Sequence, residues 1–321
     1  MELRGGIDLG GTKIQAVIVD EALRVVGQSR LPTPRSGGPS AVAKEMAMAL
    51  NEAARELGIH SRELAGIGVG SPGQVDGARG TVARAGNLPD WDEPFQLAAA
   101  LTESLGTRVF LGNDVGVALD AEARIGAGKE HGSFIGVFWG TGVGGGVVLN
   151  HERWRGNGAS GEIGHMVVRR NGAKCPCGRR GCVEAYAGRR AMENKARRDV
   201  ERGVQTSLFE IMEKKGRTQL SSGVFAKALE QDDEYTRRLI ERAVRALGAG
   251  IASACNLLDV DAVILGGGLG TRLGQPYAEK IQAAMQPHLF KRDNPPPVRV
   301  VALGDLAGAV GASLLVTDEL S

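Results

Sequence analysis

The 321-residue chain contains few cysteines and no long apolar run. Three of its four cysteines fall between residues 175 and 182, which is not the dispersed spacing of a disulfide framework. No apolar segment reaches the roughly 18 residues that a transmembrane helix requires. The first ten residues, MELRGGIDLG, lack the basic start and apolar core of a signal peptide. We therefore expect a cytoplasmic protein with no membrane partner.

The chain also lacks an excess of charge of either sign. It has 39 Lys and Arg residues against 37 Asp and Glu, and the two signs alternate in stretches such as residues 188–203. A nucleic-acid-binding domain usually carries a one-sided basic patch and a pI above about 9. Hydrophobic residues make up 42% of the chain, an ordinary share for a globular protein. We expect one large or two medium-sized domains and no nucleic-acid partner.

Glycine, in contrast, is abundant: the chain has 48 glycines, about twice the usual share near 7%. Many of them follow apolar runs in short clusters. A pattern of strand, glycine turn and returning strand occupies residues 3–20 and recurs at 133–150, and a third glycine turn at 266–268 ends an apolar strand. Such turns let backbone N–H groups approach an anion closely. Together they indicate one nucleotide held across two domains.

The remaining pattern alternates strands and helices. It predicts a duplicated α/β fold, in which ligands collect at the carboxyl ends of the strands. The other expected strands are residues 64–70, 108–114, 261–268 and 298–304. The expected helices are residues 39–58, 94–105, 271–287 and 304–320, together with much of 186–258, where the clearest helix covers 239–258.

Two glycine turns have the residues of phosphate-binding loops without the usual context. DLGGTK (8–13) is not a Walker A loop, because a strand rather than a helix follows it. GTGVGG (140–145) matches the dinucleotide pattern GxGxxG, but a strand follows it too, so we reject that interpretation. Lys13 still adds positive charge beside the first turn, and Asp8 is placed to hold a phosphate-bound Mg²⁺. A plain hairpin is the alternative for either turn alone.

Residues 161–186, GEIGHMVVRRNGAKCPCGRRGCVEAY, place three cysteines near one histidine. A nucleic-acid zinc finger would need its own ββα module, and a redox pair is typically CxxC rather than CxC. Three thiolates and an imidazole make up the Cys₃His set of a closed structural zinc site. A chance cluster is the other alternative, but Gly178 and Gly181 supply turns that can wrap a metal. Zinc here would also join the loops that carry Glu162 and Glu184.

The motifs resemble the ROK family of sugar kinases and repressors. The resemblance rests on DLGGTK, SPGQVD, GNDVGVALDAEARIGAG, GTGVGGG and GASGEIGHMVV, followed by CPCGRRGCVE. These segments occur in the family's order and span nearly the whole chain. The GEIGH and CxCGxxGCxE segments are the most specific, because unrelated residue types recur there at fixed spacing. The resemblance implies an α/β fold of the actin-like ATPase type, with two ribonuclease-H-like domains around a central cleft.

The resemblance also implies roles for individual residues. Asp114 is expected to be the catalytic base and a sugar ligand, although it could instead cap the helix that follows it. The other expected substrate ligands are Asn113, Glu162, His165, Glu184, Gly73 and Asn87. The expected contacts to ATP and Mg²⁺ are Asp8, Gly10, Gly11, Thr12, Lys13, Thr141, Gly142, Gly267 and Gly268. The expected zinc ligands are His165, Cys175, Cys177 and Cys182. One position departs from the family pattern, because Gly112 stands where glutamate is usual.

The implied activity is ATP-dependent phosphorylation of a hexose at its 6-hydroxyl, with glucose as the expected substrate. Mannose, allose, N-acetylglucosamine and N-acetylmannosamine are the alternatives, and polyphosphate is an alternative donor. A DNA-binding repressor is disfavoured, because only seven residues precede Asp8 and leave no room for a helix-turn-helix. A sugar sensor is disfavoured by the acid at residue 114. We expect a smaller domain of residues 1–114 and 305–321, a larger one of 115–304, and a homodimer formed through the larger domain.

Overall fold

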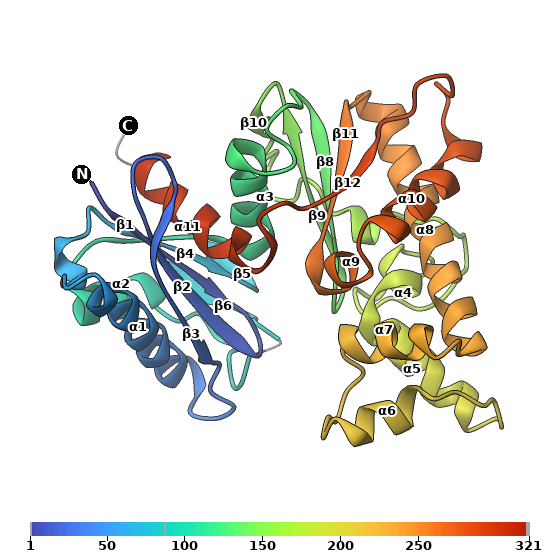
Figure 1. The fold of residues 1–321 in the computed structure, drawn as a ribbon, viewed down its shortest axis with the longest axis horizontal. Coiled ribbons are helices and arrows are strands. Elements are labelled where there is room, and N and C mark those ends of the chain that lie inside the picture. Colours follow the sequence, from blue (N-terminus) through green and yellow to red (C-terminus); the bar gives the residue numbers. More distant parts are fainter. Residues whose placement is uncertain (1, 87, 319–321) are drawn as a thin grey trace. The chain divides into compact units, whose positions relative to one another are not determined.

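The computed structural model describes residues 2–86 and 88–318, which form two α/β units (Figure 1). One unit takes the chain up to Gly126 and again from Leu303, and the other comprises Ala127–Ala302. The first unit contains a five-stranded sheet in the order β3-β2-β1-β4-β7. Its strands are β1 (Arg4–Leu9), β2 (Lys13–Val19), β3 (Val25–Pro32), β4 (Ile67–Ser71) and β7 (Val109–Asn113).

Helices cover both faces of this sheet. α1 (Gly38–Glu56) and α2 (Leu97–Leu105) pack on one face, and α3 (Asp114–Ile125) and α11 (Ala307–Asp318) pack on the other. β2 is apolar on both sides, because Ile14 and Ile18 pack toward α1 while Val17 and Val19 pack toward α11. The smaller elements of the unit are η1 (Ser61–Glu63), β5 (Gln74–Asp76), β6 (Thr81–Ala83) and η4 (Gly304–Leu306).

Glycine lets α11 lie unusually close to its neighbours. A Cβ atom on Gly68 of β4 would lie 1.7 Å from the carbonyl oxygen of Ala312 in α11. A Cβ on Gly311 of α11 would lie 1.7 Å from the carbonyl oxygen of Val117 in α3. Real Cβ atoms do not approach backbone oxygens this closely, so the helix is wedged between the sheet and α3 only because these positions lack side chains.

The second sheet repeats the plan of the first. Its order is β10-β9-β8-β11-β12, with β8 antiparallel to β9 and parallel to β11, just as β1 is antiparallel to β2 and parallel to β4. The strands are β8 (Phe134–Trp139), β9 (Val143–Leu149), β10 (Glu152–Arg153), β11 (Ala262–Gly266) and β12 (Val298–Val300). The duplication expected from residues 3–20 and 133–150 is confirmed.

The second unit is the richer in helix, and its helices and sheet share one large apolar core. α8 (Glu234–Leu258) is 25 residues long and buries one face from Tyr235 to Cys255. None of the helices in residues 2–86 and 88–318 is long and apolar enough to cross a bilayer. The other helices are η2 (Ile163–His165), α4 (Glu184–Ala187), α5 (Arg189–Val200), α6 (Leu208–Lys214), α7 (Ser222–Glu230), α9 (Gly267–Leu273), α10 (Gln275–Met285) and η3 (Gln286–His288).

Three details differ from the sequence-based expectations. The first unit includes α3 and extends to Gly126, rather than ending at residue 114, because α3 packs against α11. The helix expected at 271–287 is two helices, interrupted at Gly274, whose φ of 65° is outside the helical region. β3 was not expected at all; it is an edge strand whose residues are mostly exposed or half-buried, whereas those of β1 and β2 are almost all buried.

Candidate active site and metal centre

Two carboxylates meet at the carboxyl edge of the first sheet. Asp8 lies near the end of β1 and Asp114 follows β7, and the intervening strand β4 carries Gly70 at this level. A side chain on Gly70 would collide with α3, since its Cβ would lie 2.6 Å from Val117 Cγ2 and 3.6 Å from the Cα of Asp114. Burial, assisted by the charge of Asp114, raises the pKa of Asp8 to about 7, while Lys13 opposes the shift.

Asp114 opens α3, and its neighbour Asn113 caps the helix. The Asn113 Oδ1 accepts hydrogen bonds from the backbone N–H groups of Val115 and Gly116, both at 3.1 Å. The N-cap is therefore Asn113, and the suggestion that Asp114 itself is the cap is wrong. The Asp114 carboxylate accepts a bond of 2.9 Å from Val115 N–H, yet burial outweighs this contact and raises the pKa of Asp114. A carboxylate with a raised pKa is suited to accept a proton.

The first glycine turn is held from two sides. Its Gly10 N–H donates to the Lys13 carbonyl at 2.9 Å, and the Thr33 hydroxyl donates to the Gly10 carbonyl at 2.6 Å. Gly11 and Thr12 form the exposed tip. The Lys13 ammonium lies 2.9 Å from the Asp305 carboxylate. A phosphate at this turn would therefore share Lys13 with Asp305.

The remaining expected residues of this unit lie at the same edge or outside the described residues. Gly73 follows β4 with a φ of 90°, a conformation that favours glycine, so its presence is explained by the turn itself. Asn87 lies outside the described residues. Gly112 is in β7, where a Cβ would lie 2.8 Å from Val117 and 3.1 Å from Leu315. Packing against α3 and α11 thus explains why glycine suits a position where the ROK pattern has glutamate.

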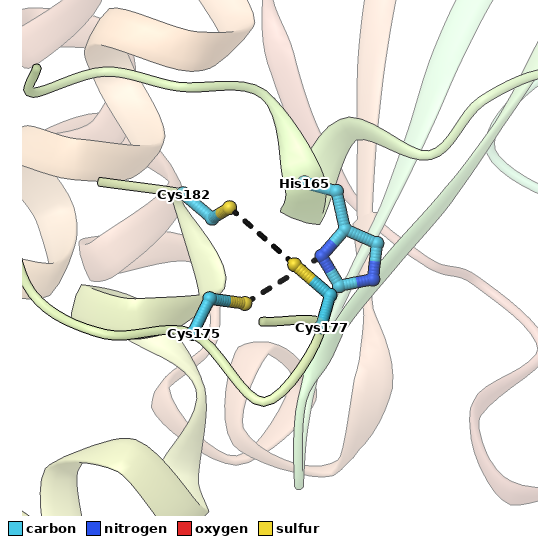
Figure 2. A group of neighbouring side chains, drawn as sticks. All are labelled: His165, Cys175, Cys177 and Cys182. Atoms are coloured by element: carbon cyan, nitrogen blue, oxygen red, sulfur yellow. Dashed lines mark hydrogen bonds between the residues drawn. The ribbon is translucent and has the colours of Figure 1, made fainter. Parts of the chain in front are cut away.

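In the second unit, His165, Cys175, Cys177 and Cys182 converge on one point (Figure 2). Their ligand atoms all lie within 4.8 Å of one another. His165 ends η2, and the three cysteines come from the following loop, which Gly178 and Gly181 turn through positive φ angles of 88° and 86°. Cys175 and Cys182 are buried, whereas Cys177 is exposed.

The spacing of this cluster fits a zinc ion. A tetrahedral site with Zn–S near 2.3 Å and Zn–N near 2.0 Å separates two sulfurs by roughly 3.8 Å and a sulfur from a nitrogen by roughly 3.5 Å. The Sγ atoms of Cys177 and Cys182 are 3.8 Å apart, and Cys175 Sγ lies 3.7 Å from His165 Nδ1. A hydrogen bond from Arg179 lowers the pKa of Cys177 to about 6, while burial raises the pKa of Cys175 to about 12. Metal binding would release the proton of Cys175.

The cluster orients polar groups around it. With Nδ1 turned toward the thiols, the other ring nitrogen of His165 lies 3.9 Å from the exposed carboxylate of Glu162. Glu184 begins α4 two residues after Cys182, and its Oε1 lies 3.9 Å from Cys175 Sγ. Glu162, His165 and Glu184 are thus attached to the same loop system, next to the cysteine cluster.

Residues 184–190, which we call the clamp segment, continue from the cysteine loop to the second glycine turn. The backbone N–H of Val143 donates to the Glu184 carboxylate at 2.9 Å, and Gly142 permits this contact because a Cβ there would lie 2.3 Å from the same oxygen. Three further bonds join the segment to the turn: Trp139 Nε1 to the Ala187 carbonyl, Arg189 N–H to the Gly140 carbonyl, and Arg190 N–H to the Thr141 carbonyl. One stretch of chain therefore supports both the cysteine cluster and the turn.

The third glycine turn lies beside the second. A Cβ on Gly140 would be 3.7 Å from the backbone nitrogen of Gly268, so the ends of β8 and β11 meet here. Gly267 has a φ of 80°, and a Cβ on it would lie 2.6 Å from the Trp139 carbonyl oxygen. Gly267 and Gly268 do not form a free loop; they are the first two residues of α9.

Two residues at these turns were not expected from the sequence, Thr33 beside the first turn and Arg189 beside the second. The Arg189 guanidinium donates to the Thr141 hydroxyl at 2.6 Å. The two residues are 48 positions apart, and no local pattern links them. The sequence around Thr141 gives no sign of this pair, which only the folded structure brings together.

These features define a protein of the actin-like ATPase fold, with paired sheets that each carry glycine turns at the strand ends. The chain belongs to the ROK family, whose model matches residues 4–319. It is 32% identical to a glucokinase of Streptomyces coelicolor, over 99% of this chain and 98% of that protein. It is also 30% identical to an N-acetylmannosamine kinase of Haemophilus influenzae, over 98% of this chain and 95% of that protein.

Solved structures agree with this assignment. A ROK hexokinase from Thermus thermophilus is 34% identical and superposes with a TM-score of 0.79, covering 99% of each chain. A ROK family glucokinase from Streptomyces griseus, solved in complex with glucose and AMPPNP, is 30% identical with a TM-score of 0.80, covering 98% of this chain and 99% of that one. The fold expected from the sequence is therefore confirmed.

Proposed function

We propose that this protein is an ATP-dependent hexose kinase that phosphorylates the 6-hydroxyl of glucose. The observation that carries the proposal is Asp114, which opens a helix at the carboxyl edge of the first sheet with a pKa raised by burial. General bases work best when their pKa is closer to the operating pH than that of an ordinary aspartate. Glucose is favoured over other hexoses by the similarity to two glucokinases at 30% and 32% identity.

In the proposed reaction, Asp114 accepts the proton of the sugar 6-hydroxyl while that oxygen attacks the γ-phosphorus of ATP. The new O6–P bond forms as the bond from the γ-phosphorus to the bridging oxygen breaks, and ADP leaves. Such transfers depend mainly on positioning and on neutralising charge. The exposed amides at Gly11 and Thr12, together with Lys13, can supply positive potential on one side of the phosphates.

Mg²⁺ would be held from the Asp8 side. Carboxylate oxygens are the ligands that Mg²⁺ prefers, and Asp8 stands next to the turn. Bound there, Mg²⁺ would neutralise charge on the phosphates, and its positive charge would also keep Asp8 ionised despite the burial that raises its pKa. In the second unit, Thr141, Gly142, Gly267 and Gly268 are the proposed nucleotide contacts.

The sugar would be held both by hydrogen-bond donors and by hydrogen-bond acceptors. The Oδ1 of Asn113 is engaged in the helix cap, which leaves its amide NH₂ as the group for a sugar oxygen. Glu162 and Glu184 offer carboxylate oxygens, and His165 offers the ring nitrogen that faces away from the thiols. A site that hydrogen-bonds each hydroxyl rejects sugars that lack one, by about 10⁴ or more in favourable cases. We include Gly73 and Asn87 among the proposed substrate contacts.

We also propose that zinc binds to His165, Cys175, Cys177 and Cys182 and acts as a brace rather than a reactant. All four ligand positions of a tetrahedral site are protein atoms, which is typical of structural zinc. The metal would fix the imidazole of His165 and the start of the clamp segment. A cytoplasmic location, the absence of a nucleic-acid partner and a homodimer formed through the second unit complete the proposal.

The proposal is tested by following ADP release from the purified protein with ATP, Mg²⁺ and a panel of sugars. The panel contains glucose, mannose, allose, fructose, N-acetylglucosamine and N-acetylmannosamine. We expect the highest kcat/KM for glucose, and we expect Asp114→Ala to lower kcat by roughly 10²–10⁴ while the protein still binds glucose. Asp92→Ala, at an exposed position of the same unit, is the matched control.

Other outcomes would change the proposal in defined ways. A preference for an N-acetylated sugar would replace glucose as the substrate but keep the mechanism. Binding of a sugar with no turnover of any member of the panel would refute the kinase and indicate a sugar sensor. Full activity of Asp114→Ala would refute the assignment of the base alone.

A further inference from the structure

The hydroxyl of Thr141, at the tip of the second glycine turn, is held by a side chain from another element. Arg189, the first residue of α5, donates from Nη2 to Thr141 Oγ1 over 2.6 Å. Thr141 itself is exposed, whereas Arg189 is partly buried. The contact is long-range, so the fold rather than the local sequence brings the two residues together.

The guanidinium of Arg189 is fixed in place by further contacts. Its Nη1 donates to the carbonyl of Leu220, and its buried Nε has no hydrogen-bond partner among the described residues. Glu193, one turn along the same helix, receives hydrogen bonds from Leu220 N–H and from Arg197. These contacts hold the guanidinium of Arg189 in one position. It stays positively charged, since an arginine side chain keeps its proton in proteins.

This contact decides which way the Thr141 proton points. A guanidinium can only donate, so the Thr141 oxygen acts as acceptor toward Arg189. The single hydroxyl proton then points away from Arg189, and among the described residues no side chain or carbonyl accepts it. Thr141, Arg189 and Arg190 also line a cavity of about 150 Å³ together with Glu193, Asn194 and Gln219. An acceptor-only, negatively charged group such as a phosphoryl oxygen matches a donor hydroxyl backed by a cation.

We propose that Arg189 is a positioning residue for the nucleotide, which orients the Thr141 hydroxyl as a donor to a phosphoryl oxygen and places positive charge behind it. The inference rests on the proposed function, because it needs a nucleotide at the second glycine turn. It assigns to Arg189 an effect on nucleotide affinity with no effect on sugar affinity. The sugar ligands proposed above include neither Arg189 nor Thr141.

The test compares Arg189→Ala, Arg189→Lys, Thr141→Val, Thr141→Ser and the double variant Arg189→Ala/Thr141→Val. Calorimetric titration measures the Kd of AMPPNP with Mg²⁺ and, separately, the Kd of glucose. Steady-state assays measure KM for ATP and kcat. Arg198→Ala is the matched control, because Arg198 is an exposed arginine on the same helix nine residues further along.

We expect Arg189→Ala and Thr141→Val each to weaken AMPPNP by about tenfold to hundredfold, the loss that follows from removing one hydrogen bond to a charged group. The double variant should be little weaker than either single one, because Arg189 acts through Thr141. Thr141→Ser keeps the hydroxyl and should bind nearly normally. Arg189→Lys keeps the charge but cannot reach both Leu220 and Thr141, so it should be intermediate. Glucose affinity and the Arg198→Ala control should not change.

Three results would overturn the inference: normal AMPPNP binding by Arg189→Ala, an equal loss of glucose affinity, or full multiplication of the two single effects in the double variant. If Arg189→Ala does not fold, Thr141→Val against Thr141→Ser and Arg189→Lys against the wild type decide the question. Failure of the proposed function looks different. A wild-type protein that binds no AMPPNP would refute both, whereas normal wild-type binding with unchanged variants refutes only the role of Arg189.

Discussion

Replacing Asp8 by asparagine should stabilise the folded protein in a pH-dependent manner. Burial, assisted by the charge of Asp114, raises the pKa of Asp8 from 3.8 to about 7. The native state therefore keeps a proton on Asp8 that the unfolded chain has already lost. The wild type loses stability as pH rises from about 4 through 7, because the unfolded state binds fewer protons than the native state there. Asparagine does not titrate, so Asp8→Asn avoids this loss.

The size of the effect follows from the pKa difference. A shift from 3.8 to about 7 corresponds to roughly 4 kcal/mol over the whole window, at about 1.4 kcal/mol per unit. Between pH 5 and pH 8 about two units of that window are crossed, or at most about 3 kcal/mol. Asp8 is only partly shielded from solvent, so we expect about 1–3 kcal/mol. For a chain of 321 residues, the melting temperature of Asp8→Asn relative to that of the wild type should rise by roughly 1.5–5 °C between the two pH values.

The assay is thermal unfolding of wild type, Asp8→Asn and the control Asp92→Asn at pH 5 and pH 8, with no nucleotide or Mg²⁺ added. Asp92 is an exposed aspartate in the same unit. A wild-type-to-variant gap that is equal at both pH values, or larger at pH 5, would refute the reasoning. Adding Mg²⁺ and ATP should narrow the gap, because the proposed ligands favour the ionised carboxylate and bind only the wild type well.

Three further outcomes follow from other parts of the molecule. Gly311→Ala should lower the free energy of unfolding by roughly 3 kcal/mol or more, because its methyl group would lie 1.7 Å from the Val117 carbonyl oxygen. The control is Gly86→Ala, where an added Cβ meets nothing within 4 Å. It should be nearly neutral in the same denaturation experiment. A chelator should release about one zinc per chain in a colorimetric assay and lower the melting temperature. Purified Cys177→Ser should contain little zinc. A wild-type protein purified without metal would contradict this prediction. The kcat/KM for glucose should fall on the acid side with an apparent pKa above 3.8, since burial raises the pKa of Asp114, and Asp114→Asn should lack this limb.

Much of the fold could be predicted because its signals are local. The first hairpin, residues 3–20, becomes β1 and β2 nearly residue for residue, since apolar alternation and a glycine turn specify it without help from the rest of the chain. The cysteine cluster was predictable for the same reason: four ligands lie within 18 residues of sequence, and the structure brings all four together. The assignment of α3 to the first unit was not predictable, because it depends on packing against α11, nearly 200 residues later.

Some residues of the candidate site could likewise be predicted from local motifs, and others could not. Asp8, Asp114 and the glycine turns stand in recognisable motifs, so sequence alone nominated them, and their roles remain predictions. Arg189 stands in an ordinary charged helix and gained significance only when folding placed it 2.6 Å from Thr141. Gly112 shows the opposite case. In the sequence it stood out as a departure from the family pattern, yet the close packing of Val117 and Leu315 explains why a glycine is present.

The clamp segment, residues 184–190, has a thermodynamic consequence. It begins two residues after Cys182 with Glu184, whose carboxylate holds Val143, and it ends on Gly140 and Thr141. Under the proposed roles, a sugar that immobilises Glu184 also removes motion from the turn that receives phosphate, so the second ligand has less conformational entropy to lose. Linkage makes this reciprocal: each ligand raises the affinity for the other by the same factor. Under these proposed roles, cooperativity between glucose and nucleotide would depend on seven consecutive residues, with the cysteine cluster at one end.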